Sequence, residues 1–245
     1  MEGAPTVKTI LCIPGNWKSR SELVRAIAEN NVDNFLFAGQ MLMNLKTKAI
    51  YEIELHEKDD QLRKAFKAAG MVNHLGEDVL DEIEKHTHVV YVIGETGTPE
   101  KAKAIAEAGN AILKAGGTGL KVETTGKAFA KEKWMQLVEA YEETNLYQMF
   151  VIDSISDGET VFSCGMHNVG LKDTILSGEE FQEAVNTISI FGYYQLIDKP
   201  VISANQTFSI SAEAPVFRIA DETEQPYAGD ELFENPFGMW RLKRV

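Results

Sequence analysis

The sequence has very little cysteine: Cys12 and Cys164 are the two in a chain of 245 residues. They lie far apart, and neither belongs to a paired motif, which excludes a disulfide framework. The N-terminal residues MEGAPTVKTI have neither the charged lead nor the apolar core of a secretory signal. We therefore expect a protein of a reducing, cytoplasmic compartment.

Long apolar runs and excess positive charge are also missing. The longest uncharged run, residues 184–197, contains Asn186 and Gln195 and is too short and too polar to span a bilayer. Lys and Arg total 24 against 37 Asp and Glu, a formal net charge of −13. Nucleic-acid binding requires a cationic surface, and the negative charge also disfavours anionic membranes. We therefore expect neither a nucleic acid nor a membrane as partner. A basic protein or a cationic ligand would suit the negative electrostatic field of the protein.

Familiar catalytic signatures are absent as well. The sequence contains no GxSxG, HExxH or CxxC motif and no EF-hand loop. It does contain an acidic C-terminal region, which is usually a solvated face. That region could instead be an interaction surface, as in an immunity-type protein that covers a basic toxin. Its acidic residues are Asp221, Glu222, Glu224, Asp230, Glu231 and Glu234.

The pattern of elements predicts an α+β fold. Apolar and charged fractions of 44% and 25% are ordinary for a globular protein. The first half gives the order strand, helix, strand, strand, helix, strand, and the second half repeats it, with apolar runs at 35–43 and 146–154 assigned to strands. This order is typical of ferredoxin-like (βαββαβ) folds. We predict two tandem ferredoxin-like units packed into one compact body; the alternative is a single mixed α/β sheet with helices on both faces.

The predicted boundaries follow from the repeat. The first βαββαβ unit covers 1–97, and the second covers 118–245 with a C-terminal extension. A connecting helix occupies 98–117, and Ala102, Ala106 and Gly109 are among its regularly spaced small residues. Small side chains at helical spacing predict a helix packed very close to its neighbours.

The stretch VFSCGMHNVGL, residues 161–171, holds the main catalytic candidates. A cysteine three residues before a histidine, Cys164 and His167, can form a thiolate–imidazolium pair or ligate a metal. Asn168 adjoins them. Lys121 and Glu123 share one strand face and form an acid–base couple if they face a cleft, or otherwise a solvated ion pair. An enzyme would gather these five residues in a pocket between the two halves.

Two further histidines make a metal hypothesis. If a strand begins at His86, then His86 and His88 point to one face and could ligate a metal. With Cys164 and His167 they would complete a zinc set, although nothing in the sequence brings the two motifs together. The alternative assigns Cys164 to the core and both histidines to a helix end and a strand start. We therefore expect no cofactor.

Four stretches also resemble a known family. They are AGNAILKAGGTGLKVETTGKAF, LYQMFV, FSCGMHNVGLKD and LFENPFGMWRL. They are similar to an uncharacterised bacterial family labelled domain of unknown function 4261, over the C-terminal half of the chain. The resemblance implies bacterial origin and no known activity, and it supplies no catalytic residues.

These observations favour a non-catalytic cytoplasmic binding or regulatory protein, with an acidic surface for a basic partner as one version. The alternative is an enzyme with a small-molecule pocket between the halves, near Cys164 and His167.

Overall fold

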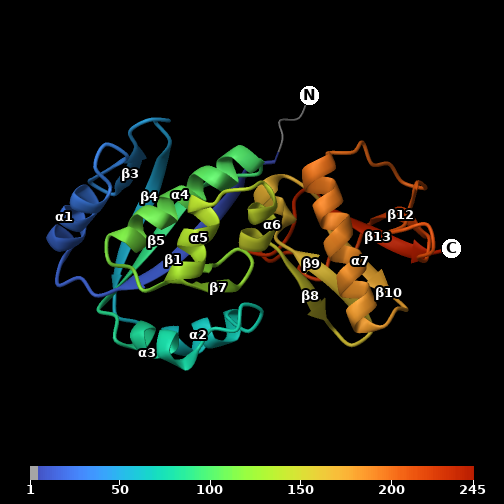
Figure 1. The fold of residues 1–245 in the computed structure, drawn as a ribbon, viewed down its shortest axis with the longest axis horizontal. Helices are drawn as coiled ribbons and strands as arrows, with labels where there is room; N and C mark the ends of the chain where they lie inside the picture. The colour runs from blue at the N-terminus through green and yellow to red at the C-terminus, as the bar shows by residue number, and fades with distance from the viewer. Residues whose placement is uncertain (1–4) are drawn as a thin grey trace. The chain divides into compact units, whose positions relative to one another are not determined.

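The computed structural model describes residues 5–245 and has a mixed α+β fold with two separate β-sheets (Figure 1). The chain divides into two compact units. The seven-stranded unit comprises Lys8–Thr96 and Glu100–Glu142, and the six-stranded unit comprises Glu143–Val245, Gly97–Pro99 and residues 5–7. None of the helices formed by residues 5–245 has the length and apolar character needed to cross a membrane.

The seven-stranded sheet is antiparallel. The neighbours β2–β3, β3–β4, β4–β5, β1–β6 and β6–β7 are antiparallel. Strands β1 and β5 also run in opposite directions, since Thr9 lies beside Thr96 and Gly15 beside Thr87. In sheet order the strands are β2 (Phe35–Ala38), β3 (Met41–Asn44), β4 (Ile50–Glu57), β5 (His88–Thr96), β1 (Val7–Gly15), β6 (Gly119–Val122) and β7 (Lys127–Ala130). The helices of this unit are α1 (Arg20–Asn30), α2 (Leu62–Ala69), α3 (Glu77–Glu84), α4 (Pro99–Lys114) and α5 (Lys131–Glu139).

Helix α4 packs directly on the sheet of this unit. A Cβ atom built on Gly109 would lie 2.8 Å from Leu11 Cδ1 on β1 and 2.9 Å from Leu120 Cδ1 on β6. The indole nitrogen of Trp134 in α5 donates a hydrogen bond to the Ala106 carbonyl, 3.2 Å away. The helix is therefore closely packed against its sheet, and it lies with β6 and β7 in the seven-stranded unit. The boundaries at 97 and 118 remain predictions.

The six-stranded sheet is mixed. Its β10 and β13 are parallel, and the other neighbouring strands are antiparallel. In sheet order the strands are β11 (Thr207–Phe208), β12 (Phe217–Glu222), β13 (Met239–Arg244), β10 (Asp173–Ser177), β9 (Thr160–Cys164) and β8 (Ile152–Ser156). The helical segments of this unit are α6 (Thr144–Phe150), the 3₁₀ turn η1 (Met166–Val169), α7 (Phe181–Tyr193) and the π turn η2 (Tyr194–Asp198).

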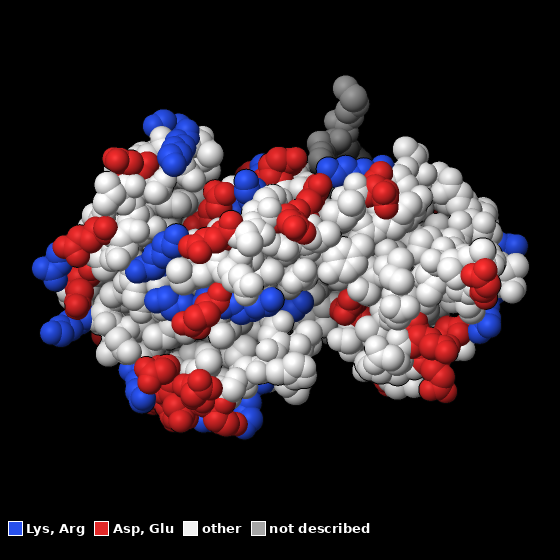
Figure 2. Space-filling model, viewed as in Figure 1, with Lys and Arg blue, Asp and Glu red and all other residues white. Residues whose placement is uncertain are grey.

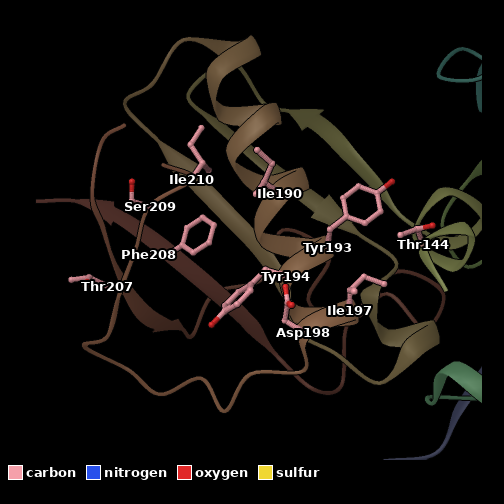
Figure 3. A pocket seen from close by; sticks show the side chains of 10 residues that line it. All are labelled: Thr144, Ile190, Tyr193, Tyr194, Ile197, Asp198, Thr207, Phe208, Ser209 and Ile210. Carbon is pink, nitrogen blue, oxygen red and sulfur yellow. The ribbon is translucent and has the colours of Figure 1, made fainter. Parts of the chain in front are cut away.

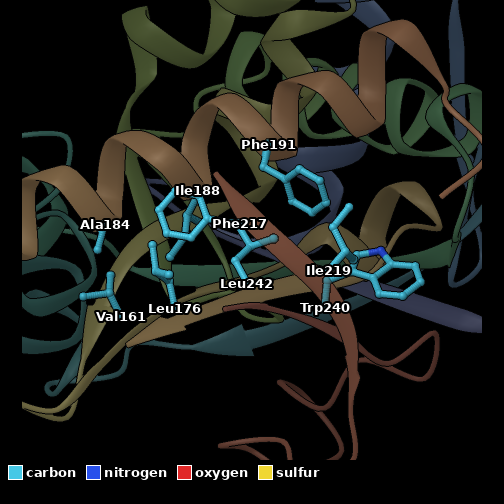
Figure 4. Packing of buried hydrophobic residues seen from close by; sticks show 9 residues of the cluster. All are labelled: Val161, Leu176, Ala184, Ile188, Phe191, Phe217, Ile219, Trp240 and Leu242. Atoms are coloured by element: carbon cyan, nitrogen blue, oxygen red, sulfur yellow. The ribbon is translucent and has the colours of Figure 1, made fainter. Parts of the chain in front are cut away.

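Helix α7 covers one face of this sheet and closes its core (Figure 4). Ala184, Ile188 and Phe191 recur at helical spacing and point toward the strands. Burying this many apolar side chains supplies the main driving force for the unit. The complete cluster is Val161, Leu176, Ala184, Ile188, Phe191, Phe217, Ile219, Trp240 and Leu242.

The tandem ferredoxin-like arrangement is not confirmed. A βαβ unit joins parallel strands through its helix. Here α2 and α3 connect β4 to β5, yet these strands are direct neighbours and antiparallel, with Glu52 opposite Ile93. The alternative of one single sheet is wrong, because the strands form two sheets.

Two predicted strands also take another form. Residues 146–150 belong to helix α6, where Leu146, Tyr147, Met149 and Phe150 are all buried. A short, wholly buried apolar run does not reveal its periodicity, so a strand and a buried helix cannot be told apart from it. The run at 35–43 is a hairpin, β2 and β3, because Gly39 adopts φ +57° between them.

The packing of α4 predicts that Gly109→Ala destabilises the protein. Alanine gains helix propensity, but its methyl group meets Leu11 and Leu120, and overpacking of this kind costs about 1–3 kcal/mol. Chemical denaturation should show a lower free energy of unfolding for the variant. An equally stable or more stable variant would contradict the packing described.

Candidate functional site

The candidate residues divide between the two units. Cys164, His167 and Asn168 belong to the six-stranded unit. The seven-stranded unit contains Lys121 and Glu123, and also the two histidines of the metal hypothesis, His86 and His88.

The turn that carries Cys164 and His167 is tightly constrained. Gly165 and Gly170, on either side of η1, have φ values of +118° and +80°, which side chains other than glycine rarely adopt. The Gly97 N–H donates to the Asn168 carbonyl, 3.0 Å away, and a Cβ atom on Gly170 would lie 2.2 Å from the Gly97 carbonyl oxygen. These contacts leave no room for a larger residue at position 170.

The centre of this region is the buried carboxylate of Asp173. Its Oδ1 accepts hydrogen bonds from Ser163 Oγ at 3.0 Å and from the Met166 N–H at 3.2 Å. Its Oδ2 accepts from Asn235 Nδ2 at 2.6 Å, and the same amide group donates to the Leu171 carbonyl at 2.9 Å. Burial raises the pKa of Asp173 to about 6, although the hydrogen bonds oppose this shift. One side chain thus links β9, η1, β10 and the segment before β13.

Cys164 is a buried thiol. Its Sγ lies 3.8 Å from the Phe233 carbonyl and donates to it. Burial, and then the negative charges of Asp173 and Asp230, raise the pKa of Cys164 well above its usual value. The thiolate is the form that attacks carbon or binds a metal, so a protonated Cys164 is suited to neither role.

His167 and Asn168 are both buried and hydrogen-bonded locally. Asn168 Nδ2 donates to the Gly165 carbonyl at 2.9 Å and lies 3.3 Å from His167 Nε2. Nε2 is therefore the acceptor, and the ring proton sits on Nδ1, which has no hydrogen-bond partner among residues 5–245. Burial lowers the pKa of His167 to about 4, so the ring is neutral and a weak base.

Lys121 and Glu123 pair with each other on β6. Nζ of Lys121 lies 2.7 Å from Glu123 Oε2, and both side chains are largely covered, at 16% and 19% exposure. Cys12 lies opposite Lys121 on β1. Burial, and then the charge of Glu123, raise the pKa of Cys12. The structure shows an ion pair on a sheet face, beside the protonated thiol of Cys12 and the hydroxyl of Tyr91.

The two histidines of the metal hypothesis have separate roles. His86 Nδ1 donates to the Ile83 carbonyl at 2.6 Å, and its Nε2 accepts from the Asp59 N–H at 3.0 Å, so both ring nitrogens are used. His88 contacts Thr87 Oγ1 at 3.1 Å. Within the described part of the chain, no group of three or more His, Cys, Asp or Glu side chains is arranged to hold a metal ion.

The structure adds a groove that the sequence reasoning missed. It has a volume of about 610 Å³ and lies in the six-stranded unit, between the outer face of α7 and η2 and the segment that includes β11 (Figure 3). Ile190, Tyr193, Tyr194 and Ile197 follow the spacing i, i+3, i+4, i+7. This second apolar stripe faces away from the core residues of α7, and it was the signal in the sequence that could have revealed the groove. The lining residues are Thr144, Ile190, Tyr193, Tyr194, Ile197, Asp198, Thr207, Phe208, Ser209 and Ile210.

Aromatic rings that pack against one another form part of the groove wall. The ring centroids of Tyr194 and Phe208 are 5.8 Å apart, and Phe208 also packs edge-on against the core residue Phe191 at 4.8 Å. Asp198, which is exposed, is the lining residue that carries a charge at neutral pH. Stacked rings beside one carboxylate can hold an apolar or cationic group. They offer no acid–base pair for catalysis.

Comparison with known proteins gives no assignment. No family model, no curated protein and no solved structure matches the chain. The resemblance to domain of unknown function 4261, and the bacterial origin it implies, stay predictions.

The burial of Asp173 predicts an unusual pH dependence of stability. A carboxyl whose pKa is raised in the folded state stabilises the fold below its unfolded pKa and loses that contribution as pH rises through 6. Relative to Asp173→Asn, the wild-type free energy of unfolding should fall by about 2 kcal/mol between pH 4 and pH 7. Urea denaturation at a series of pH values measures this difference.

Asp157→Asn is the matched control. Backbone N–H groups of Thr160 and Glu159 lower the pKa of the exposed Asp157, so its contribution is lost as pH falls instead. If the difference in free energy of unfolding between wild type and variant changed with pH in the same direction for Asp173→Asn and Asp157→Asn, the raised pKa of Asp173 would be contradicted.

The turn geometry gives a second prediction. Gly170 and Gly178 share φ +80°, but a Cβ atom on Gly178 would meet no atom within 4 Å. Gly170→Ala should therefore be less stable than Gly178→Ala by about 1–3 kcal/mol, since only the former also clashes with a backbone carbonyl. Thermal and chemical unfolding of the two variants measure the difference, and equal losses would rule out the close contact with Gly97.

Proposed function

We propose that this chain is a non-catalytic binding protein, and that the groove beside α7 holds an apolar, basic segment of a partner protein. The observation that carries the proposal is the aromatic groove itself. The cytoplasmic location, the regulatory role and the bacterial family belong to the same proposal.

The exposure of the groove residues supports an apolar ligand. Ile190, Tyr194 and Ile197 are 38%, 36% and 39% exposed, although they lie side by side on one helical stripe. Contiguous exposed apolar side chains of this kind typically mark interaction sites. Tyrosine and phenylalanine are favoured anchors because they bury a large area at little cost in conformational entropy.

The charges support a basic partner. Asp198 lies in the groove, and the structure records no ion pair for it within residues 5–245. The same unit also exposes four carboxylates of the acidic C-terminal region, namely Glu224, Asp230, Glu231 and Glu234, whereas Asp221 of that region is paired with Lys172. Complementary charge speeds encounter and selects the partner more than it adds affinity. An immunity-type protein that neutralises a basic toxin is one version of this proposal.

Acidic side chains gather elsewhere too, as Figure 2 shows over α2 and α3. There Arg63 bridges Glu77 and Asp81 at 2.8 Å each, and Lys67 also contacts Glu77. These carboxylates already have cationic partners within the chain. They support a partner site less well than Asp198 does.

The enzyme alternative has less support. It requires a reactive thiol or an effective base near Cys164 and His167. Burial favours the protonated form of Cys164 and the neutral, weakly basic form of His167. Lys121 and Glu123 already neutralise each other.

The groove predicts which peptides the protein selects. A random peptide library panned on the purified protein should yield sequences that combine aromatic or aliphatic residues with Lys or Arg. Tyr194→Ala should weaken a selected peptide by about tenfold or more, since it removes an aromatic anchor. Asp198→Asn should weaken it less and reduce the salt dependence of binding. Fluorescence anisotropy measures both effects.

Phe181→Ala provides the control. Phe181 begins α7, the helix that leads directly into η2, and is 47% exposed, but it does not line the groove. Selected peptides that bind Tyr194→Ala and Phe181→Ala equally well would exclude the groove as the binding site.

A further inference from the structure

One wall of the groove beside α7 is the free edge of the six-stranded sheet. The strand order of this sheet ends at β11, so one side of Thr207–Phe208 has no neighbouring strand. Both residues line the groove, across from Tyr194 and Ile197 of the helical wall (Figure 3). A strand edge with unpaired backbone groups is a template for pairing with another chain.

The hydrogen bonds of β12 show how its own backbone is oriented. Bonded and non-bonded residues alternate along an antiparallel ladder. The Val245 N–H donates to the Val216 carbonyl, 3.0 Å away, and this pair continues the register in which Phe217 faces Arg244. Val216 therefore turns its backbone groups to β13, and Phe217 and Ile219 turn theirs to β11.

The orientation of β11 follows from that of β12. The Ile219 N–H donates to the Gln206 carbonyl, 2.8 Å away, as a residue that faces β11 should. Phe208 lies opposite Phe217, so it turns its backbone groups to β12. Thr207, between Gln206 and Phe208, turns its N–H and carbonyl away from the sheet. Thr207 is exposed, and no other group within residues 5–245 bonds to either of them.

We infer that the groove binds its partner segment in an extended conformation, as a strand added to β11 and hydrogen-bonded to Thr207. This inference rests on the proposed function, because it concerns how the same groove holds its ligand. One backbone N–H of the segment donates to the Thr207 carbonyl, and one of its carbonyls accepts from the Thr207 N–H. Strand addition of this kind takes its affinity from the main chain and its specificity from alternate side chains.

The alternation of side chains sets the sequence of the ligand. Phe208 points to the face that α7 covers, since its ring packs against Phe191, and Thr207 points to the other face. The ligand residue opposite Thr207 therefore points away from α7. Its two neighbours point toward Phe208 and Tyr194, whose ring centroids are 5.8 Å apart. The ligand needs apolar residues at positions i and i+2.

The charge of the groove places a basic residue beside this apolar pair. Asp198 is exposed, follows the Tyr194 stripe and lines the groove, so Lys or Arg of the segment suits it. A helical ligand would instead carry apolar residues at i, i+3 and i+4, and it would leave the Thr207 backbone groups unpaired. The open edge therefore favours an extended basic segment.

Backbone methylation of the selected peptides tests this mode of binding without any change to the protein. Each backbone N–H is replaced in turn by N–CH₃, and fluorescence anisotropy measures the affinity. Methylation of the N–H that bonds to Thr207 should weaken binding by about tenfold, because the donor is lost. The adjacent N–H groups face solvent on the outer side of the added strand, and their methylation should change the affinity much less.

Thr207→Pro tests the same bond from the protein side. Proline is tolerated on an edge strand where the N–H faces solvent, so the variant should fold while it lacks the outward donor. Binding of the selected peptides should weaken by about tenfold. Thr207→Ala is the matched control, since it removes the side chain, keeps the N–H and should bind as wild type does. Thermal unfolding of both variants checks the fold.

The outcomes separate this inference from the proposed function. If no peptide is selected, or if selected peptides bind Tyr194→Ala as well as Phe181→Ala, the proposed function fails and the binding mode fails with it. If Tyr194→Ala weakens binding but every methylated peptide binds like its parent, the groove is the site and the added strand is overturned. Selected peptides with apolar residues at i, i+3 and i+4 would also overturn it.

Discussion

The six-stranded unit depends on one buried charge, the carboxylate of Asp173. It accepts hydrogen bonds from Ser163, from the Met166 backbone and from Asn235, and so joins three parts of the chain that lie up to 72 residues apart in sequence. A buried carboxylate is costly unless such donors surround it. The same contacts hold Cys164 and His167 in a closed turn, where burial suppresses the reactivity of both. We therefore propose that Cys164 and His167 serve the fold.

The range over which a sequence signal acts explains which structural predictions were correct. A strong local signal was sufficient for α4, because small residues at helical spacing act over a few positions. Sheet order is set by contacts between distant segments, and the pairing of Glu52 with Ile93 leaves no trace in the sequence of either strand. The run at 146–150 was assigned to a strand because it is short and mostly apolar, a pattern that a strand and the buried helix α6 share.

The candidate site shows the same limit. Spacing identified Cys164 and His167 as a pair, but whether a thiol is reactive depends on burial, which only the fold determines. The groove was missed because Ile190, Tyr193, Tyr194 and Ile197 look like core residues in sequence, and only the packing of α7 shows that they face outward. Binding surfaces and cores use the same residue types, so exposure is what distinguishes them.

The central claim is that the Cys–His turn is structural, and alkylation of native protein tests it most directly. Mass spectrometry after iodoacetamide treatment at neutral pH reports the modification of Cys164 peptide by peptide. We expect Cys164 to stay unmodified for as long as the protein is folded and to react fully in denaturant. Rapid modification of Cys164 in the folded protein would contradict the account, because it requires an accessible thiolate.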